Sequence, residues 1–410
     1  MKFEDYSISL ELKKNLSKHN FRRPTDIQYK AIPPILKGED VLAIAQTGTG
    51  KTAAFAIPVI HKIQKRKKNK RAEGIACLVM VPTHELAQQI TEVFIKLAFK
   101  TNVKITGIFG GVDQAPQISK LEGGIDILIA TPGRLFDLVS QGYLKLNRIG
   151  ILVLDEADHM LDLGFIKDIN DLIRFLPRKR QTLFFSATIN NKIKKLAYSL
   201  VNKPIRIEVS PKNPVAKNID HQVAFIEMDD KRAFLERLIN ENPDSKVLVF
   251  VRTKVRAERV KKAMARVNIK GDTIHSDKVQ NERTEILSRF KKGTLELLIA
   301  TDVSARGIDI PNVDYVVNYD LPEVAENYVH RVGRTGRGTK KGKAVSFCSH
   351  DEKAVLSEIE TFLGKEITKL EIEKEAYNET LDFTQDTDHN WKKLIQDHEK
   401  ELKKLKKKKK

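Results

Sequence analysis

Cysteine, tryptophan and long apolar runs are scarce in this chain, which has two cysteines and one tryptophan among 410 residues. Cys77 and Cys348 lie in apolar, strand-like runs without the neighbours of a metal ligand, so we expect buried thiols in a reducing compartment and no zinc chemistry. No segment reaches the roughly 20 apolar residues of a membrane-spanning helix. The start, MKFEDYSISLELKKNL, lacks the apolar centre of a signal peptide. These absences predict a cytoplasmic protein without a membrane partner.

Acidic residues are outnumbered, with 54 Asp and Glu against 73 Lys and Arg, which gives a formal charge of +19. Such an excess favours a polyanionic partner, because basic side chains that neutralise phosphates release counterions. A basic surface kept for solubility is the alternative. The chain ends in KKLKKKKK, and we assign residues 366–410 to a Lys-rich, disordered or partly helical tail. That tail either tethers nucleic acid or has no function.

Two series of short apolar runs alternate with amphipathic stretches. The first comprises VLAIA (41–45), ACLVMVP (76–82), DILIAT (126–131), ILVLDE (151–156) and TLFFSAT (182–188). The second comprises KVLVFVRT (246–253), DTIHS (272–276), LELLIATD (295–302), DYVVNYD (314–320) and KAVSFCS (343–349). Continuous apolar runs are typical of parallel strands covered on both faces. We predict an α/β fold with two such domains, 1–209 and 221–365, joined by a linker at 210–220.

Three carboxylates, Asp155, Glu156 and Asp158, follow one predicted strand directly and require a cation nearby. The segment AQTGTGKT (45–52) suggests why, since its glycine backbone can approach phosphates while Lys51 supplies charge and Thr52 can ligate Mg²⁺. Both motifs follow strands, and ligands of open α/β sheets gather at those strand ends. We predict a nucleoside triphosphate site in which Asp155 holds Mg²⁺ and Glu156 deprotonates the attacking water. The residues expected around the phosphates are Ala45, Gln46, Thr47, Gly48, Thr49, Gly50, Lys51 and Thr52.

A cluster of arginines in HRVGRTGR (330–337) can neutralise the charge that hydrolysis develops on the γ-phosphate. We predict that Arg334 and Arg337 act as arginine fingers supplied by the second domain, so that the catalytic site is complete only when the domains close. A basic helix end at the surface is the alternative.

Further short motifs occur in a fixed order, and together they carry a resemblance. They are FRRPTDIQ (21–28), PTHELA (82–87), Gly110–Gly111, TPGR (131–134), DEAD (155–158), SAT (186–188), VFVRT (249–253), QNER (280–283) and ATDVSARGID (300–309). With AQTGTGKT and HRVGRTGR, they make the chain similar to the DEAD-box ATP-dependent RNA helicases of superfamily 2 over about residues 1–350. The compact core with a basic tail suggests the bacterial RhlE-like branch.

The resemblance implies two RecA-like domains, ATP and Mg²⁺ as cofactors, and RNA-stimulated ATP hydrolysis that bends one RNA strand and unwinds short duplexes. It implies that Gln28 reads adenine with Phe21 nearby, and that Asp309 contacts the ribose. The coupling residues it implies are Asp158, Ser186, Thr188, His330 and Arg331, with Asp158 pairing with His330 in the closed state. The RNA contacts it implies are Pro82, Gly111, Thr131, Arg134, Arg252, Gln280, Arg283 and Thr301.

One departure from the family affects a predicted RNA contact, since His84 stands in PTHELA where the family usually has Arg. A near-neutral imidazole binds phosphate less strongly than a guanidinium, so we expect weaker RNA affinity there. Two rival functions remain open, a DNA-acting ATPase and an ATP-dependent RNA clamp or scaffold with little unwinding. Protein partners in RNA turnover or ribosome assembly are a further expectation.

Overall fold

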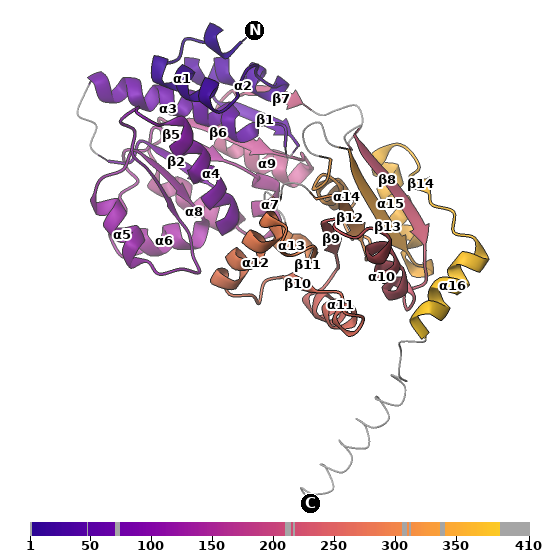
Figure 1. The fold of residues 1–410 in the computed structure, drawn as a ribbon. Coiled ribbons are helices and arrows are strands. Elements are labelled where there is room, and N and C mark those ends of the chain that lie inside the picture. The colour runs from indigo at the N-terminus through magenta and orange to yellow at the C-terminus, as the bar shows by residue number, and fades with distance from the viewer. Residues whose placement is uncertain are drawn as a thin grey trace, which may run out of the picture. The chain divides into compact units, whose positions relative to one another are not determined.

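The computed structural model describes residues 2–46, 48–69, 74–209, 215, 218–305, 310, 313–336 and 341–385. They form two compact units (Figure 1): residues 1–217 together with 277–285 and 303–311 make up one, and the other residues from 218 on make up the second. We call the chain up to residue 217 the first lobe and the chain from residue 218 the second lobe, after the sheet that each contains. Each is built around its own seven-stranded sheet, and the strands pair in parallel. The predicted α/β fold with two parallel sheets is confirmed.

The first lobe has a sheet with the strand order β3-β4-β2-β5-β6-β1-β7. Its strands are β1 (Val41–Ala45), β2 (Cys77–Met80), β3 (Ile105–Ile108), β4 (Ile127–Ala130), β5 (Ile151–Leu154), β6 (Gln181–Ser186) and β7 (Ile205–Val209). Successive strand side chains point to opposite faces. Val41 and Ala43 therefore enter one hydrophobic cluster while Leu42 enters the other. Both faces are buried, which explains the unbroken apolar runs.

Helices cover both faces of this sheet. One cluster is closed by η1 (Phe3–Asp5), α1 (Leu10–Lys18), α2 (Asp26–Lys37), α3 (Lys51–Asn69) and α4 (His84–Leu97). The other is closed by α5 (Ala115–Glu122), α6 (Pro132–Ser140), α7 (Ala157–Asp162), α8 (Ile166–Phe175) and α9 (Asn191–Leu200). Because the helices lie over the faces of the sheet, they do not cover the carboxyl ends of the strands, where the connecting loops lie.

The second lobe repeats the plan with the strand order β10-β11-β9-β12-β13-β8-β14. Its strands are β8 (Ile219–Phe225), β9 (Val247–Phe250), β10 (Gly271–Ile274), β11 (Leu297–Ala300), β12 (Tyr315–Asn318), β13 (Gly342–Cys348) and β14 (Thr368–Lys369). Its helices are α10 (Lys231–Glu241), α11 (Lys254–Arg266), α12 (Gln280–Lys292), α13 (Asp302–Ala305), α14 (Ala325–Val332), η2 (His350–Glu352), α15 (Lys353–Leu363) and α16 (Lys374–Gln385).

Ordered elements continue beyond residue 365, where the sequence predicted the tail to begin. Strand β14 adds to β8, and α16 packs against α10. The Tyr377 hydroxyl donates to Asp230 Oδ2 at 2.7 Å, and its ring lies 4.8 Å from that of Phe234. Residues 386–410, with the lysine run, lie outside the described residues, so the roles predicted for them stay predictions. Within the described ranges, no helix is long and apolar enough to cross a membrane.

Candidate functional site

Three neighbouring strands of the first lobe carry the predicted nucleotide motifs at their carboxyl ends. The strands β5, β6 and β1 lie side by side, with Leu154 paired to Phe184 and Ile44 paired to Ser186. Parallel pairing brings the loops that follow these strands to one edge of the sheet. The sheet therefore gathers the loop of 46–50, the DEAD carboxylates and the SAT motif.

The loop after β1 has the backbone that a phosphate site needs. Ala45 ends β1 in the core, and Gly48 and Gly50 adopt φ of +81° and +93°, values that glycine tolerates without strain. Thr49 Oγ1 donates to the carbonyl of Gln46 at 2.7 Å, which closes the loop. Thr47 lies outside the described residues, and Thr52 lies in the first turn of α3.

Lys51, the first residue of α3, has a buried and unsatisfied ammonium group. The residue is 6% exposed, and its Nζ has no hydrogen-bond partner among the described residues. A buried cation without such partners is costly, because desolvation is not repaid. The position at a helix N-terminus suits a polyanion. The chemistry of Lys51 thus fits a bound phosphate.

Gln28 lies in the first turn of α2 and faces this site, although a polar residue at a helix start ordinarily lies at the surface. It is 3% exposed, and its Nε2 donates to the carbonyl of Gly50 at 3.1 Å. Its Oε1 accepts from the N–H of Thr25 at 3.0 Å, in a capping box at the start of α2. Phe21 packs edge-on to Phe3, at 6.0 Å between ring centroids. Gln28 therefore ties α2 to the phosphate loop.

We expect Gly50→Ala to destabilise the nucleotide-free protein by about 1–3 kcal/mol. A Cβ at residue 50 would overlap the amide nitrogen of Gln28, and the positive φ would be strained as well. Gly48→Ala is the matched control, because its φ is also positive but its Cβ would meet nothing within 4 Å. Urea unfolding without nucleotide compares the two. Equal losses of unfolding free energy in Gly50→Ala and Gly48→Ala would show that the Gln28 side chain is not held against Gly50.

Asp155 is buried among charges at the end of β5. It is 3% exposed, and burial raises its pKa to about 6, opposed by the positive charge of Lys51 and reinforced by Glu156. One of its oxygens accepts the N–H of Glu156 at 3.0 Å. A nearby cation would stabilise the ionised form of this carboxylate, and the predicted role of Asp155 in holding Mg²⁺ stays a prediction.

Glu156 has an unusual backbone conformation for its residue type. Its φ of 51° and ψ of 48° lie in the left-handed region, at the N-cap of α7. Such conformations cost energy for residues with a Cβ and cluster at functional sites. His159 Nδ1 lies 3.5 Å from Glu156 Oε2, a neighbour that the sequence analysis missed.

Asp158 joins the DEAD motif to the SAT motif. Its Oδ2 accepts the N–H groups of Ala187 and Thr188 at 3.1 Å each, and the Thr188 hydroxyl at 3.3 Å. Ser186 Oγ donates to the carbonyl of Thr188 at 2.8 Å. These hydrogen bonds tie the two motifs together, and the coupling role of Asp158, Ser186 and Thr188 stays a prediction. The pairing of Asp158 with His330, which lies in α14, stays a prediction.

The predicted RNA contacts of the first lobe lie on the loops after β2, β3 and β4. Pro82 precedes α4, Gly111 is exposed with φ of +77°, and Thr131 is the N-cap of α6. Arg134 Nη2 donates to the carbonyl of Val112 at 2.8 Å. Its Nη1 is buried without a hydrogen-bond partner among the described residues, which leaves a donor for an anion.

The predicted RNA contacts of the second lobe are partly committed to protein partners. Arg252 has a side chain 39% exposed and contacts Glu352 Oε1 at 3.3 Å and the carbonyl of Leu321 at 3.4 Å. Gln280 and Arg283 lie in the first turn of α12, and Thr301 follows β11.

The arginines of HRVGRTGR differ from one another in their surroundings. Arg331 is 2% exposed, and its guanidinium binds both carboxylate oxygens of Asp302, at 2.5 and 2.8 Å. Arg334 is 3% exposed, and its Nε donates to the carbonyl of His330 at 3.2 Å. Arg337, like the predicted ribose contact Asp309, lies outside the described residues.

Comparison with known proteins identifies the family. The DEAD/DEAH box helicase family matches residues 25–196, and the helicase conserved C-terminal domain matches residues 230–339. The chain is 38% identical over 372 residues to the ATP-dependent RNA helicase CshA of Listeria monocytogenes, covering 90% of this chain and 70% of CshA. The chain belongs to the DEAD-box ATP-dependent RNA helicases. Enzymes of this family hydrolyse ATP in an RNA-stimulated manner.

Other DEAD-box helicases agree with this assignment. The ATP-dependent RNA helicase RhlB of Shewanella oneidensis is 38% identical over 379 residues, which cover 92% of this chain and 86% of RhlB. The structure of S. cerevisiae Dbp5 bound to RNA and ADP BeF3 has a TM-score of 0.82 and 31% identity, covering 90% of this chain and 95% of Dbp5. The two sheets are thus RecA-like domains. The predicted RhlE-like branch is not confirmed by these relatives.

Proposed function

We propose that the first lobe of this DEAD-box helicase binds ATP at the loops after β1, β5 and β6, and that RNA held by both lobes stimulates its hydrolysis. The observation that carries this proposal is the buried ammonium of Lys51, which has no hydrogen-bond partner among the described residues and lies at the same sheet edge as Asp155. Phosphate oxygens would supply the missing partners of Lys51.

Magnesium suits the oxygen ligands at this edge. The Thr52 hydroxyl and the Asp155 carboxylate would hold it, and when bound it would offset the charge of the phosphates. Among the described residues, no group of three or more His, Cys, Asp or Glu could hold a metal ion by itself. Mg²⁺ in such enzymes is bound by one or two protein oxygens together with phosphates and water, so the sparse ligand set fits.

The remaining roles are those that the family motifs imply, carried over to the matching residues of this chain. Glu156 accepts the proton of the attacking water, and Arg334 and Arg337 neutralise charge on the γ-phosphate. Gln28 contacts adenine through the part of its amide that Gly50 and Thr25 leave available, with Phe21 close by. Asp309 contacts the ribose.

RNA binding is supported by the donors of Arg134 and by the N-termini of α4 and α6, which present N–H groups to phosphates. Contacts to phosphates carry no base sequence, so the enzyme should accept RNA of any sequence. The similar protein Dbp5 is bound to RNA and ADP BeF3 in its structure, which supports the same pair of ligands here. When ATP and RNA are both bound, the two lobes would hold the same RNA strand and bend it. The bent strand would then separate from its complement in a short duplex.

ATP turnover of the full chain with RNA, with DNA of the same sequence, and with neither tests the function. We expect RNA to raise the rate about tenfold or more, and DNA to have little effect. Strand displacement on a short duplex is measured in parallel. Equal stimulation by DNA would favour the DNA-acting rival, and ATP-dependent binding without displacement would favour the RNA clamp.

A further inference from the structure

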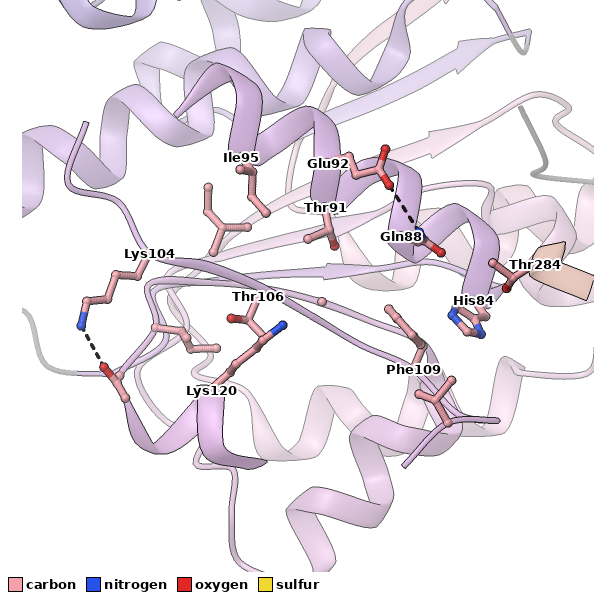
Figure 2. Close-up of a pocket in the computed structure, with 16 residues that line it drawn as sticks. His84, Gln88, Thr91, Glu92, Ile95, Lys104, Thr106, Phe109, Lys120 and Thr284 are labelled. Atoms are coloured by element: carbon pink, nitrogen blue, oxygen red, sulfur yellow. Dashed lines mark hydrogen bonds between the residues drawn. The ribbon is translucent and has the colours of Figure 1, made fainter. Parts of the chain in front are cut away.

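A groove in the first lobe follows the outer edge of β3, and we call it the β3 groove. Strand β3 ends the sheet, and among the described residues no strand pairs with its outer side. The groove has a volume of about 620 Å³ and is lined by β3, by residues of α4 and α5, and by Thr284 of α12, which belongs to the same compact unit (Figure 2). It thus opens between the two helical layers of the lobe.

One end of the β3 groove is formed by two stacked aromatic rings. His84 and Phe109 lie 3.7 Å apart between ring centroids, at an interplanar angle of 23°. Burial lowers the pKa of His84 below its usual value of 6.5, so the imidazole is neutral at physiological pH. The structure therefore gives His84 the role of a flat stacking partner rather than that of a cation.

Basic side chains lie along the rest of the groove. Figure 2 shows Lys104 at the end opposite His84 and Phe109, while Lys120 extends from α5 toward Thr106. Lys104 Nζ donates to the carbonyl of Gly123 at 2.8 Å, whereas Lys120 is exposed on α5. The acid in the lining, Glu92, accepts a hydrogen bond from Gln88 at 3.3 Å.

The aromatic end of the groove is continuous with the proposed RNA contacts. His84 follows Pro82 by two residues, and Phe109 precedes Gly111 by two. Val112, which also lines the groove, holds Arg134 through its carbonyl. An RNA strand that contacts Gly111 and Arg134 therefore passes the aromatic end of the groove.

We propose that the β3 groove is a subsite for a nucleotide of single-stranded RNA beyond those held at Gly111 and Arg134. Its base stacks on the Phe109–His84 pair, and its phosphates face Lys120. Aromatic rings bind unpaired bases without regard to sequence, and lysines add a salt-dependent attraction. The inference rests on the proposed RNA binding.

An extended peptide that adds to β3 is the other occupant this geometry could take. The strand is four residues long, and Lys104 directly precedes it. Short edge strands with lysine nearby resist the addition of another strand. The stacked rings and their continuity with the RNA contacts have no use in strand addition, so these observations favour RNA.

Binding of oligouridines of about 6 to 12 nucleotides, in the presence of a non-hydrolysable ATP analogue, tests the proposal. Affinity of the intact protein should rise when the RNA becomes long enough to enter the groove. Phe109→Leu should remove that gain, about 5- to 100-fold, and leave the affinity for the shortest RNA unchanged. Phe99→Leu is the matched control, because Phe99 is 53% exposed and lies outside the groove lining.

A second variant guards against a folding defect in Phe109→Leu. Lys120 is exposed, so Lys120→Gln should fold normally and reduce the salt dependence of binding by about 0.7 in log–log slope, for the longer RNA only. Equal affinities of wild type and both variants at every length would overturn the proposal in favour of the peptide. Failure of the wild type to bind even the shortest RNA would instead contradict the proposed function.

Discussion

Glu156→Gln should reduce RNA-stimulated ATP turnover by about two to four orders of magnitude while ATP binding persists. The amide keeps the size of the carboxylate but cannot accept a proton from water. The Lys51 ammonium and the Asp155 carboxylate are retained, so the phosphates and Mg²⁺ still bind. The variant should therefore remain in its ATP-bound, RNA-gripping state.

Single-turnover ATP hydrolysis and the dissociation rate of labelled RNA measure the two consequences. Glu208→Gln on β7 is the matched control, because that side chain is 49% exposed and pairs with Arg206 at the surface. The control should hydrolyse ATP at the wild-type rate and release RNA as rapidly. Rapid turnover by Glu156→Gln would show that another group accepts the proton.

The nucleotide site could be predicted from the sequence because its residues are contiguous with strand signals. Each predicted apolar run overlaps a strand, and the loops after β1, β5 and β6 carry the motifs. Their proximity follows from parallel pairing. The left-handed backbone of Glu156 could not be predicted, because Glu rarely adopts it and no glycine marks the turn.

The strands that the sequence analysis missed explain where apolar patterns fail. Strands β3 and β7 end the first sheet, β14 ends the second, and β8, the fourth strand missed, lies beside β14 and has exposed residues among its buried ones. Along β7 only one residue is buried, and along β3 buried and half-buried residues alternate. Edge strands of this kind give no continuous apolar run. The β3 groove depends on such an edge, so neither it nor the stacking of His84 on Phe109 could be inferred from periodicity.

The burial of Gln28 and Arg331 was also beyond the sequence, since both are polar residues that normally favour the surface. Each is buried because partners from distant segments of the chain satisfy its polar groups, and local sequence patterns do not reveal such partners. Gln28 meets Gly50, 22 residues away, and Arg331 meets Asp302, 29 residues away. The family resemblance supplied a coupling role for Arg331, but the contacts add a structural one.

Arg331→Met should destabilise the second lobe by about 3–5 kcal/mol. The change removes the fork that binds Asp302, together with the hydrogen bond from Nη1 to the carbonyl of Asp320 at 2.6 Å. Asp302 would keep its charge with its principal partner gone. Hydrogen exchange at the amides of β12 and α14, followed in urea, reports the stability of this lobe.

Two further variants separate geometry from charge. Arg289→Met removes an ion pair with Asp272 in which the arginine side chain is 44% exposed, and it should cost about 1 kcal/mol or less. Arg331→Lys retains the charge but cannot bind both oxygens of Asp302, so most of the loss should persist. If Arg331→Met left the exchange rates unchanged and lowered only ATP turnover, Arg331 would act in coupling alone. Asp302 begins α13, and Asp309, the predicted ribose contact, follows that helix in the sequence. We therefore expect the free energy of unfolding of the second lobe and the rate of ATP turnover to fall together.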